Sequence, residues 1–251
     1  MKNYKNFTIH QFEEIDSTNS HAFNLTRENK LFDREVVVAN KQISGRGRLD
    51  RKWESQAGNL FCSIILRPKT LKIPSHSAHK LSFLTILALK NAILAIDKKS
   101  ENKIQLKWPN DLLINGAKAS GILLENSFSG DFVDFAIIGV GVNIKNYPQN
   151  TLFKATSFEN EKIEISKDSF LEIFLDEFEI LYNFIEKFGI DEAFVNIRKL
   201  WLKNAYKLNE TVEVNLGSKK YSGVFEDIDK NGSMVLRKDN KELEISFGDV
   251  C

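Results

Sequence analysis

Residues 45–53 form the segment of this chain that is best suited to bind an anion. They read Gly-Arg-Gly-Arg-Leu-Asp-Arg-Lys-Trp and follow a strand-like apolar run at residues 36–39. Glycines let backbone amides approach a ligand closely, and arginines present forked donors that match carboxylates and phosphates. Trp53 adds a flat face against which a purine could stack. The segment predicts an anion-binding loop, although a solvated basic loop would have a similar composition.

A second group of polar residues lies between residues 107 and 121. The segment Lys107-Trp108-Pro109-Asn110-Asp111 places an amide and a carboxylate where proline stops a strand. Taken alone, the sequence Pro-Asn-Asp indicates only a turn, because all three residue types are common in turns. Lys118 follows the turn Asn115-Gly116, which is a strong hairpin signal. A single lysine beside a turn is commonly solvated, so the interest of Lys118 depends on the residues around it.

Two further segments have both a structural and a ligand-binding interpretation. Gly139 and Gly141 lie in an apolar strand that ends at Asn143. Glycines weaken a buried strand unless something must approach its backbone, so they indicate either a close ligand or a bend. Asn143 could contact an adenine edge or cap a turn. The segment 17–19, Ser-Thr-Asn, is either a helix N-cap or part of a polar pocket.

The composition makes the basic segment a local feature rather than part of a general basic surface. The 251 residues contain 35 Lys+Arg and 34 Asp+Glu, a net charge of +1, which argues against a nucleic-acid coat. Cys62 and Cys251 have neither disulfide-framework nor metal-ligand spacing, so a reducing cytoplasm is expected. No apolar segment of the signal-peptide type follows the N-terminus. The run at residues 81–96 is too short and too interrupted to span a bilayer, and predicts a core helix.

The spacing of the apolar residues predicts an α+β fold with two domains, at residues 1–204 and 205–251. In the larger domain, strands are expected at residues 9–15, 36–39, 60–66, 104–108, 112–114, 119–125 and 132–140. Helices are expected from the polar segment 16–19 to about residue 29, and at residues 77–97, 167–188 and 190–203. Short alternating strands at residues 212–214, 221–225, 234–236 and 243–247 predict a small β-barrel.

Together, these segments resemble the biotin protein ligases, in the same order along the chain. The resemblance rests on Ser17-Thr18-Asn19, Gln42, Gly45-Arg46-Gly47-Arg48 with Arg51-Lys52-Trp53, Lys107-Trp108-Pro109-Asn110-Asp111, Lys118 with Gly121-Ile122-Leu123-Leu124-Glu125, and Gly139-Val140-Gly141-Val142-Asn143. It runs from about residue 9 to residue 145, and the small C-terminal β domain also fits. The resemblance implies a mixed-sheet catalytic domain of the class II aminoacyl-tRNA synthetase type, followed by an SH3-like barrel.

The resemblance also implies a two-step reaction that consumes ATP. The carboxylate of biotin attacks the α-phosphate of ATP, which gives biotinyl-5′-AMP and pyrophosphate. The amine of one lysine on a biotin carboxyl carrier protein then attacks the mixed anhydride and releases AMP. ATP and biotin are therefore the implied substrates, and Mg²⁺ is the implied cofactor. No nucleophile from the enzyme is required.

The resemblance assigns roles to individual residues. Lys118, Arg48 and Arg51 would be catalytic, because cations are needed where two anions meet. The implied biotin-binding residues are Ser17, Thr18, Asn19, Gln42, Gly45, Arg46, Gly47, Arg48, Lys118 and Gly121. The implied ATP-binding residues are Arg46, Arg48, Arg51, Trp53, Lys107, Asn110, Lys118, Gly139 and Asn143. Asp111 would help to organise Mg²⁺. The loop at residues 45–53 would close over the adenylate and be mobile without it.

Two rival functions are considered. The closest is a lipoate or octanoate ligase of the same superfamily, whose typical Arg-Arg-x-x-Gly-Gly loop is absent from this sequence. The second is a non-enzymatic nucleic-acid-binding protein, against which the near-neutral charge counts. Some biotin protein ligases carry an N-terminal helix-turn-helix domain, but here the motif at Ser17 begins almost at the N-terminus, so no DNA binding is expected. A cytoplasmic protein without membrane contact is expected, and a homodimer is one alternative for its oligomeric state.

Overall fold

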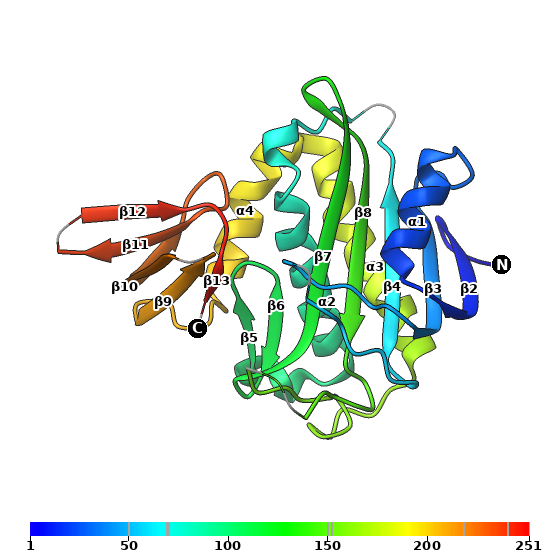
Figure 1. Cartoon of the computed structure of the whole chain (residues 1–251), viewed down its shortest axis with the longest axis horizontal. Coiled ribbons are helices and arrows are strands. Elements are labelled where there is room, and N and C mark those ends of the chain that lie inside the picture. Colours follow the sequence, from blue (N-terminus) through cyan, green and yellow to red (C-terminus); the bar gives the residue numbers. More distant parts are fainter. Residues whose placement is uncertain are drawn as a thin grey trace.

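The larger part of the computed structural model is an eight-stranded sheet, and the model describes residues 1–49, 51–68, 71–149, 151, 153–217, 219–239 and 241–250. The strand order is β1-β2-β3-β4-β8-β7-β6-β5 (Figure 1). The strands are β1 Lys2–Tyr4, β2 Phe7–Ile15, β3 Glu35–Gln42, β4 Leu60–Leu66, β5 Ile104–Lys107, β6 Asp111–Ile114, β7 Ala117–Ser129 and β8 Phe132–Val142. Among the described residues, β2 and β3 pair in parallel and the other neighbouring strands of this sheet pair antiparallel. The sheet is therefore mixed, as predicted.

The predicted strands are present, and most of them extend beyond the predicted bounds. Strand β4 has the predicted bounds and is buried along its whole length, which explains its continuous apolar sequence. Asn115 and Gly116 have φ values of 51° and 74° and form the turn between β6 and β7. This is the left-handed conformation that the Asn-Gly signal predicts for a tight hairpin. The strand predicted to end at Trp108 ends at Lys107, where the turn towards β6 begins.

Helices cover both faces of the sheet (Figure 1). Helix α1, Thr18–Arg27, covers one face, where Ala22 packs with Val37, Ile65 and Ile137. The other face is covered by α2 Lys80–Ile96, α3 Lys167–Phe188 and α4 Ile190–Leu202, with short 3-10 helices at Ser75–Ser77 and Lys98–Lys103. The alternation of side chains along each strand separates the two groups of core residues.

Helix α2 is the predicted core helix. By length and composition the segment Ser75–Ile96 could cross a membrane, but 67% of its most apolar window is buried inside the protein. The helix contacts β6 and β7 on one side and α3 and α4 on the other. An apolar sequence on nearly all sides of a helix is expected for such a position.

The C-terminal part forms a separate five-stranded antiparallel sheet in the order β12-β11-β10-β9-β13. Its strands are β9 Thr211–Leu216, β10 Lys219–Ile228, β11 Met234–Lys238, β12 Lys241–Ile245 and β13 Asp249–Val250. This arrangement is consistent with the predicted SH3-like barrel, and the domain boundary at residues 204 and 205 stays a prediction. The indole of Trp108 donates to the carbonyl of Gly232 at 3.1 Å, which joins the C-terminal part to the larger sheet. Cys62 is buried and free, whereas Cys251 lies outside the described residues.

Candidate active site

The Arg-rich loop between β3 and β4 crosses the face of β7 and β8 on the α1 side of the sheet (Figure 1). It folds back on itself, because the amide of Trp53 donates to the Gly45 carbonyl at 2.9 Å and that of Gly47 to the Arg51 carbonyl at 2.7 Å. The three arginines therefore project from a short turn rather than from an extended segment. That this loop is mobile before a ligand binds stays a prediction.

A cavity of about 120 Å³ lies beneath this loop. Most of the residues predicted for biotin and ATP line it, from segments that are far apart in the sequence. The lining residues are Ser17, Thr18, Asn19, Gln42, Arg46, Gly47, Arg48, Arg51, Lys52, Trp53, Asn110, Asp111, Lys118, Gly121, Ile122, Leu123, Gly139, Val140, Gly141 and Asp249. Of the predicted site residues, Gly45, Lys107 and Asn143 do not line this cavity.

One end of the cavity is built by the start of α1. The hydroxyl of Ser17 caps the helix by accepting from the amide of Ser20. The amide and hydroxyl of Thr18 both donate to Gln42 Oε1, at 2.8 and 3.2 Å. Asn19 Nδ2 donates to Glu125 Oε2 at 2.9 Å. The two interpretations of residues 17–19 are therefore both correct, since the N-cap also lines a polar pocket.

Glycines allow side chains to pack closely against the floor and the loop of this cavity. A Cβ atom on Gly139 would lie 2.1 Å from Asn19 Oδ1, and one on Gly141 would lie 2.5 Å from the Trp53 ring. A Cβ atom on Gly45 would lie 2.4 Å from the Trp53 carbonyl oxygen. Real Cβ atoms do not approach that closely, so these positions require glycine. Gly45 shapes the loop from behind the cavity.

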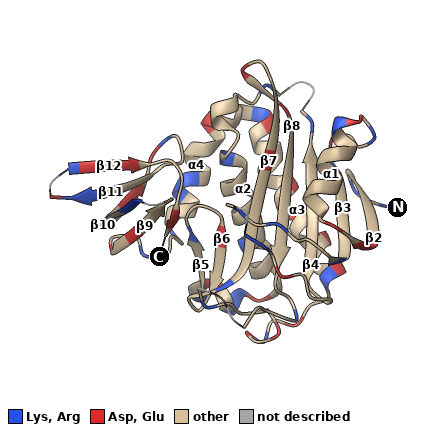
Figure 2. Cartoon of the chain, viewed as in Figure 1, with Lys and Arg blue, Asp and Glu red and all other residues tan. Residues whose placement is uncertain are grey.

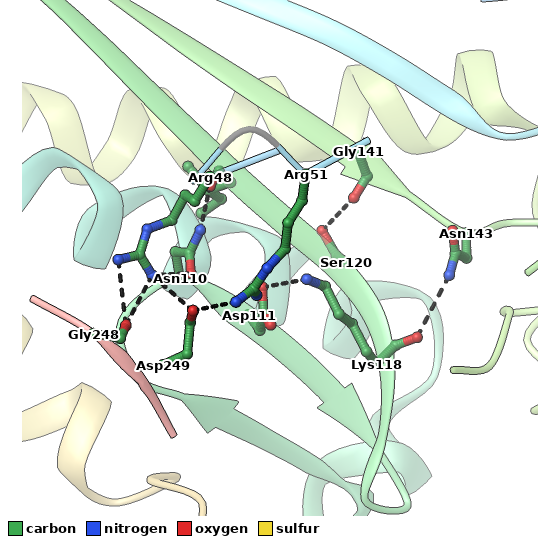
Figure 3. A network of polar contacts seen from close by, with 11 residues as sticks. Arg48, Arg51, Asn110, Asp111, Lys118, Ser120, Gly141, Asn143, Gly248 and Asp249 are labelled. Atoms are coloured by element: carbon green, nitrogen blue, oxygen red, sulfur yellow. Dashed lines mark hydrogen bonds and ion pairs between the residues drawn. The ribbon is translucent and has the colours of Figure 1, made fainter. Parts of the chain in front are cut away.

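Four of the cations that line the cavity lie beside carboxylates. Lys118 Nζ lies 2.7 Å from Asp111 Oδ1, and Arg46 Nη2 lies 2.9 Å from Glu125 Oε1. Arg51 pairs with Asp249, which also lies 3.5 Å from Arg48 Nη1 (Figure 3). Burial lowers the pKa of the Arg48 guanidinium, and Asp249 acts in the opposite direction. Arginine remains charged at neutral pH even so.

A second cavity, of about 210 Å³, lies on the other side of Trp53. It shares Arg51, Lys52, Trp53 and Lys118 with the first cavity, so the two spaces adjoin at these four side chains, the Trp53 indole among them. Its remaining lining residues are Glu54, Asn143, Pro148, Thr151, Phe153 and Ala155. The cations common to both cavities therefore lie where the two spaces meet.

The two predicted ATP-binding residues that the first cavity lacks lie beside the second. Asn143 lines it, and its Nδ2 donates to the carbonyl of Thr156 at 3.0 Å. The Lys107 ammonium is buried and lies 3.5 Å from the ring centroid of Phe153, which lines the same cavity. Direct contact of either residue with ATP stays a prediction.

Two acidic residues of the site, Asp249 and Glu125, received no site role from the sequence, although Glu125 stands in one of the motifs. Asp249 comes from β13, about two hundred positions away from the arginines that it contacts. No sequence signal pointed to it, because the contact depends on how the C-terminal sheet docks. Glu125 could have been found, since the strand period of two places it on the same face as Gly121 and Leu123.

Basic residues are not confined to the loop. Along the ribbon in Figure 2, Lys and Arg residues are interspersed with Asp and Glu residues in both parts of the chain. Within the described residues, no group of three or more His, Cys, Asp or Glu side chains could hold a metal ion. Asp111 is therefore a single carboxylate beside Lys118 rather than part of a metal cluster.

Comparisons with known proteins show the family of this chain. Residues 11–143 match the model of the Biotin/lipoate A/B protein ligase family, and residues 207–251 match the Biotin protein ligase C terminal domain. The Biotin--[acetyl-CoA-carboxylase] ligase of Paracoccus denitrificans is 33% identical over 228 residues, which cover 88% of this chain and 91% of that protein. The Bifunctional ligase/repressor BirA of Bacillus subtilis is 32% identical over 242 residues, covering 94% of this chain and 71% of that protein.

A solved structure gives the same result for the whole chain. The biotin protein ligase of Aquifex aeolicus, in complex with biotin and ATP, superposes with a TM-score of 0.78 at 26% identity. The match covers 97% of each chain and so includes both sheets. On the strength of these matches, the chain belongs to the biotin/lipoate A/B protein ligase family.

Proposed function

We propose that this chain is a biotin–[biotin carboxyl carrier protein] ligase. It activates biotin with ATP as biotinyl-5′-AMP and transfers the biotinyl group to one lysine of the carrier. The observation that carries the proposal is the position of Lys118 and Arg51, which line both cavities at the point where they adjoin beside Trp53. Two findings support the proposal. The matched relative from Paracoccus denitrificans is named a biotin ligase, and the Aquifex aeolicus structure contains bound biotin and ATP.

Activation requires two anions to meet. A carboxylate oxygen attacks the α-phosphorus, a new oxygen–phosphorus bond forms, and the bond to pyrophosphate breaks. Lys118, Arg48 and Arg51 offset the repulsion between the carboxylate and the phosphate, and neutralise the charge that develops on the phosphate oxygens. Closure of the loop over these groups would exclude water from the mixed anhydride.

The two cavities suit the two halves of the adenylate. The first has hydrogen-bonding groups at Ser17, Thr18 and Gln42, which match the ureido ring and carboxylate of biotin. The second is bounded by the Trp53 indole and Phe153, flat surfaces that suit an adenine. Biotin in the first cavity and adenosine in the second would bring the carboxylate and the α-phosphate together beside Lys118.

The transfer step needs no nucleophile from the enzyme. The carrier amine, neutral after losing a proton to solvent, attacks the acyl carbon. The bond between that carbon and the phosphate oxygen breaks so that AMP leaves, and the nitrogen loses a second proton to solvent to give the amide. Arg48, Arg51 and Lys118 stabilise the departing phosphate because they already hold it in the first step. The substrate lysine and the adenylate supply all the reacting atoms.

Mg²⁺ enters this proposal with ATP. The ion commonly keeps several waters and binds through substrate phosphates and one or two carboxylates, rather than in an all-protein site. Asp111 is the carboxylate placed to meet it, and Lys118 is its present partner. When bound, the ion would neutralise phosphate charge.

The proposal extends to partners and location. The carrier is the biotin carboxyl carrier subunit of a carboxylase, and the enzyme acts in the cytoplasm. Absence of DNA binding and the homodimer alternative both stay predictions. Gel filtration with light scattering, and a mobility-shift assay with operator-like DNA, would test them separately.

Biotin-dependent exchange of label between pyrophosphate and ATP tests the proposed function. The proposal predicts exchange with biotin and none with lipoate or octanoate. Exchange with lipoate alone would identify the rival acyl ligase of the same family, and exchange with none of the three acids would contradict the reaction class. The loop variant Arg48→Ala serves as the inactive control, because it removes a phosphate-binding group.

A further inference from the structure

The C-terminal sheet contributes two hydrogen-bond acceptors to the arginines of the loop. The carboxylate of Asp249 pairs with Arg51 and lies 3.5 Å from Arg48 Nη1. The preceding carbonyl, from Gly248, accepts from Nη1 and Nη2 of Arg48, both at 3.3 Å. Figure 3 shows both acceptors facing the two guanidinium groups, with Lys118 and Asp111 alongside.

The chain is shaped to present these acceptors. Gly248 has a φ of 146°, which L side chains rarely adopt, and a Cβ atom there would lie 2.8 Å from Val214 Cγ1. Asp249 pairs with Asn215 across β13 and β9, so its backbone is fixed. Its side chain is only 16% exposed although it carries a charge. A carboxylate in such a place needs cationic partners.

Without an anion, Arg48, Arg51 and Lys118 would repel one another. Like charges a few ångströms apart at a partly buried site raise the free energy of the arrangement that holds them together. Exposed arginines that lack a fixed partner would turn towards water, and their guanidinium groups would no longer face the same phosphate. The Asp249 carboxylate offsets this repulsion, and it contacts each guanidinium through a single nitrogen, Nη1 of Arg48 and Nη2 of Arg51.

We propose that Asp249 is a positioning residue for ATP. It holds Arg48 and Arg51 together at the phosphate position, and thereby makes ATP binding depend on the docking of the C-terminal sheet. The proposal deepens the proposed function and rests on it for the identity of the anion. Asp249 itself touches the arginines rather than the reacting atoms.

Calorimetric titration of the full chain with Mg–ATP tests the proposal. Asp249→Asn keeps the shape of the side chain and removes its charge, and should weaken ATP binding about tenfold, the effect of losing one charge-assisted hydrogen bond. Asp249→Glu retains the charge and should bind ATP more tightly than the Asn variant. The matched control is Asp227→Asn, since Asp227 lies in β10 of the same C-terminal sheet and pairs with Arg198 of α4, but lines neither cavity. It should bind ATP like the wild type.

A double-mutant cycle separates positioning from a general effect on folding. If Asp249 acts through the two arginines, then Asp249→Asn should change the ATP affinity of an Arg51→Ala protein less than that of the wild type, and that of a protein lacking both Arg48 and Arg51 by less than about twofold. An undiminished effect in either background, or an Asp249→Asn protein that binds ATP as tightly as the wild type or more tightly, would overturn the proposal. The latter result would mean that the carboxylate competes with phosphate. Asp249→Ser replaces the Asn variant if the latter does not fold.

The same titrations distinguish this proposal from the proposed function. A wild type that binds ATP but shows no biotin-dependent exchange contradicts the ligase activity, and the affinity of Asp249→Asn still decides the role of Asp249. A wild type that does not bind ATP contradicts both.

Discussion

Lys118 Nζ and Asp111 Oδ1 lie 2.7 Å apart on adjacent strands that the Asn115-Gly116 turn connects. The hairpin register pairs Asp111 with Gly121 and Leu113 with Lys118, so the turn fixes the separation of the two charges. Gly121 leaves space beside both, because a Cβ atom there would lie 3.2 Å from each side chain. The Asn115-Gly116 turn thus positions Lys118, the cation on which the proposed chemistry depends.

Lys118→Ala should abolish most adenylate formation without unfolding the protein. Removal of one group that stabilises developing charge typically costs about a hundredfold to a thousandfold in rate. Biotin-dependent ATP–pyrophosphate exchange measures the effect. Lys41→Ala is the control, since Lys41 is an exposed lysine paired with Glu14 on neighbouring strands. Near-normal exchange by Lys118→Ala would remove this lysine from its proposed role.

Gly45→Ala should impair the loop more than Gly47→Ala. The new Cβ at residue 45 would meet the Trp53 carbonyl at 2.4 Å, but the nearest atom to a Cβ at residue 47 lies 3.4 Å away. We expect Gly45→Ala to weaken biotin binding or to release free adenylate, as measured by calorimetry and by chromatography of the reaction products. Equal behaviour of the two variants would show that the packing of residue 45 is unimportant for the loop.

Trp53→Ala should join the two cavities into one. Loss of a stacking surface for a base commonly costs about tenfold in affinity, and ATP binding should weaken by that factor. Titration of ATP into the variant measures it, with Phe32→Ala as the control because Phe32 is exposed and lines neither cavity. An ATP affinity equal to that of the wild type would contradict the role of the indole as the wall between adenosine and biotin.

Acidification should destabilise the contact between α2 and the C-terminal sheet through His79. Burial lowers the pKa of the His79 imidazole below its usual value of 6.5, and Lys80 adds to that effect. The unfolded chain therefore binds a proton more readily than the folded chain, so stability falls as the pH drops through 6.5 and levels off below the folded-state pKa.

Melting temperatures between about pH 8 and about pH 5.5 would show this effect. His79→Gln should reduce the dependence, because glutamine does not titrate and can still donate to the carbonyl of Asn231, the present partner of His79. Burial also lowers the pKa of His21, which therefore contributes to the pH dependence in the same direction. His21→Gln should remove that second contribution to the pH dependence of the melting temperature. If the melting temperature of His79→Gln depended on pH as steeply as that of the wild type, His79 would not be the source of the effect.

Local patterns predicted the elements of the fold well, and long-range contacts explain what they missed. Helix α3 has its predicted bounds, Lys167–Phe188, because its apolar residues recur with the helical period along one stripe. Strand β13 has only two residues and exists because β9 pairs with it, so no periodicity could predict it. The same applies to Asp249, whose partners lie about two hundred residues earlier.

The site was predictable to the extent that its residues stand in continuous segments. The turns and glycines at residues 45–47, 115–121 and 139–143 need particular residue types, which leave a readable pattern. Of the acidic partners of the cations, Asp111 stands in such a continuous segment, Glu125 follows a strand period that points to the cavity, and Asp249 has no sequence signal of either kind. The division of the site into two cavities that adjoin at Trp53 depends on packing and could not be predicted from the order of residues.

Direct detection of the adenylate tests the central claim most sharply. The wild-type protein is mixed with ATP, Mg²⁺ and biotin in the absence of a carrier, and the bound small molecules are separated and identified by mass spectrometry. The account predicts one equivalent or less of biotinyl-5′-AMP per protein chain, with pyrophosphate as the second product and no adenylate of lipoate in a parallel reaction. Formation of lipoyl-AMP instead, or of ADP without any acyl-adenylate, would contradict it.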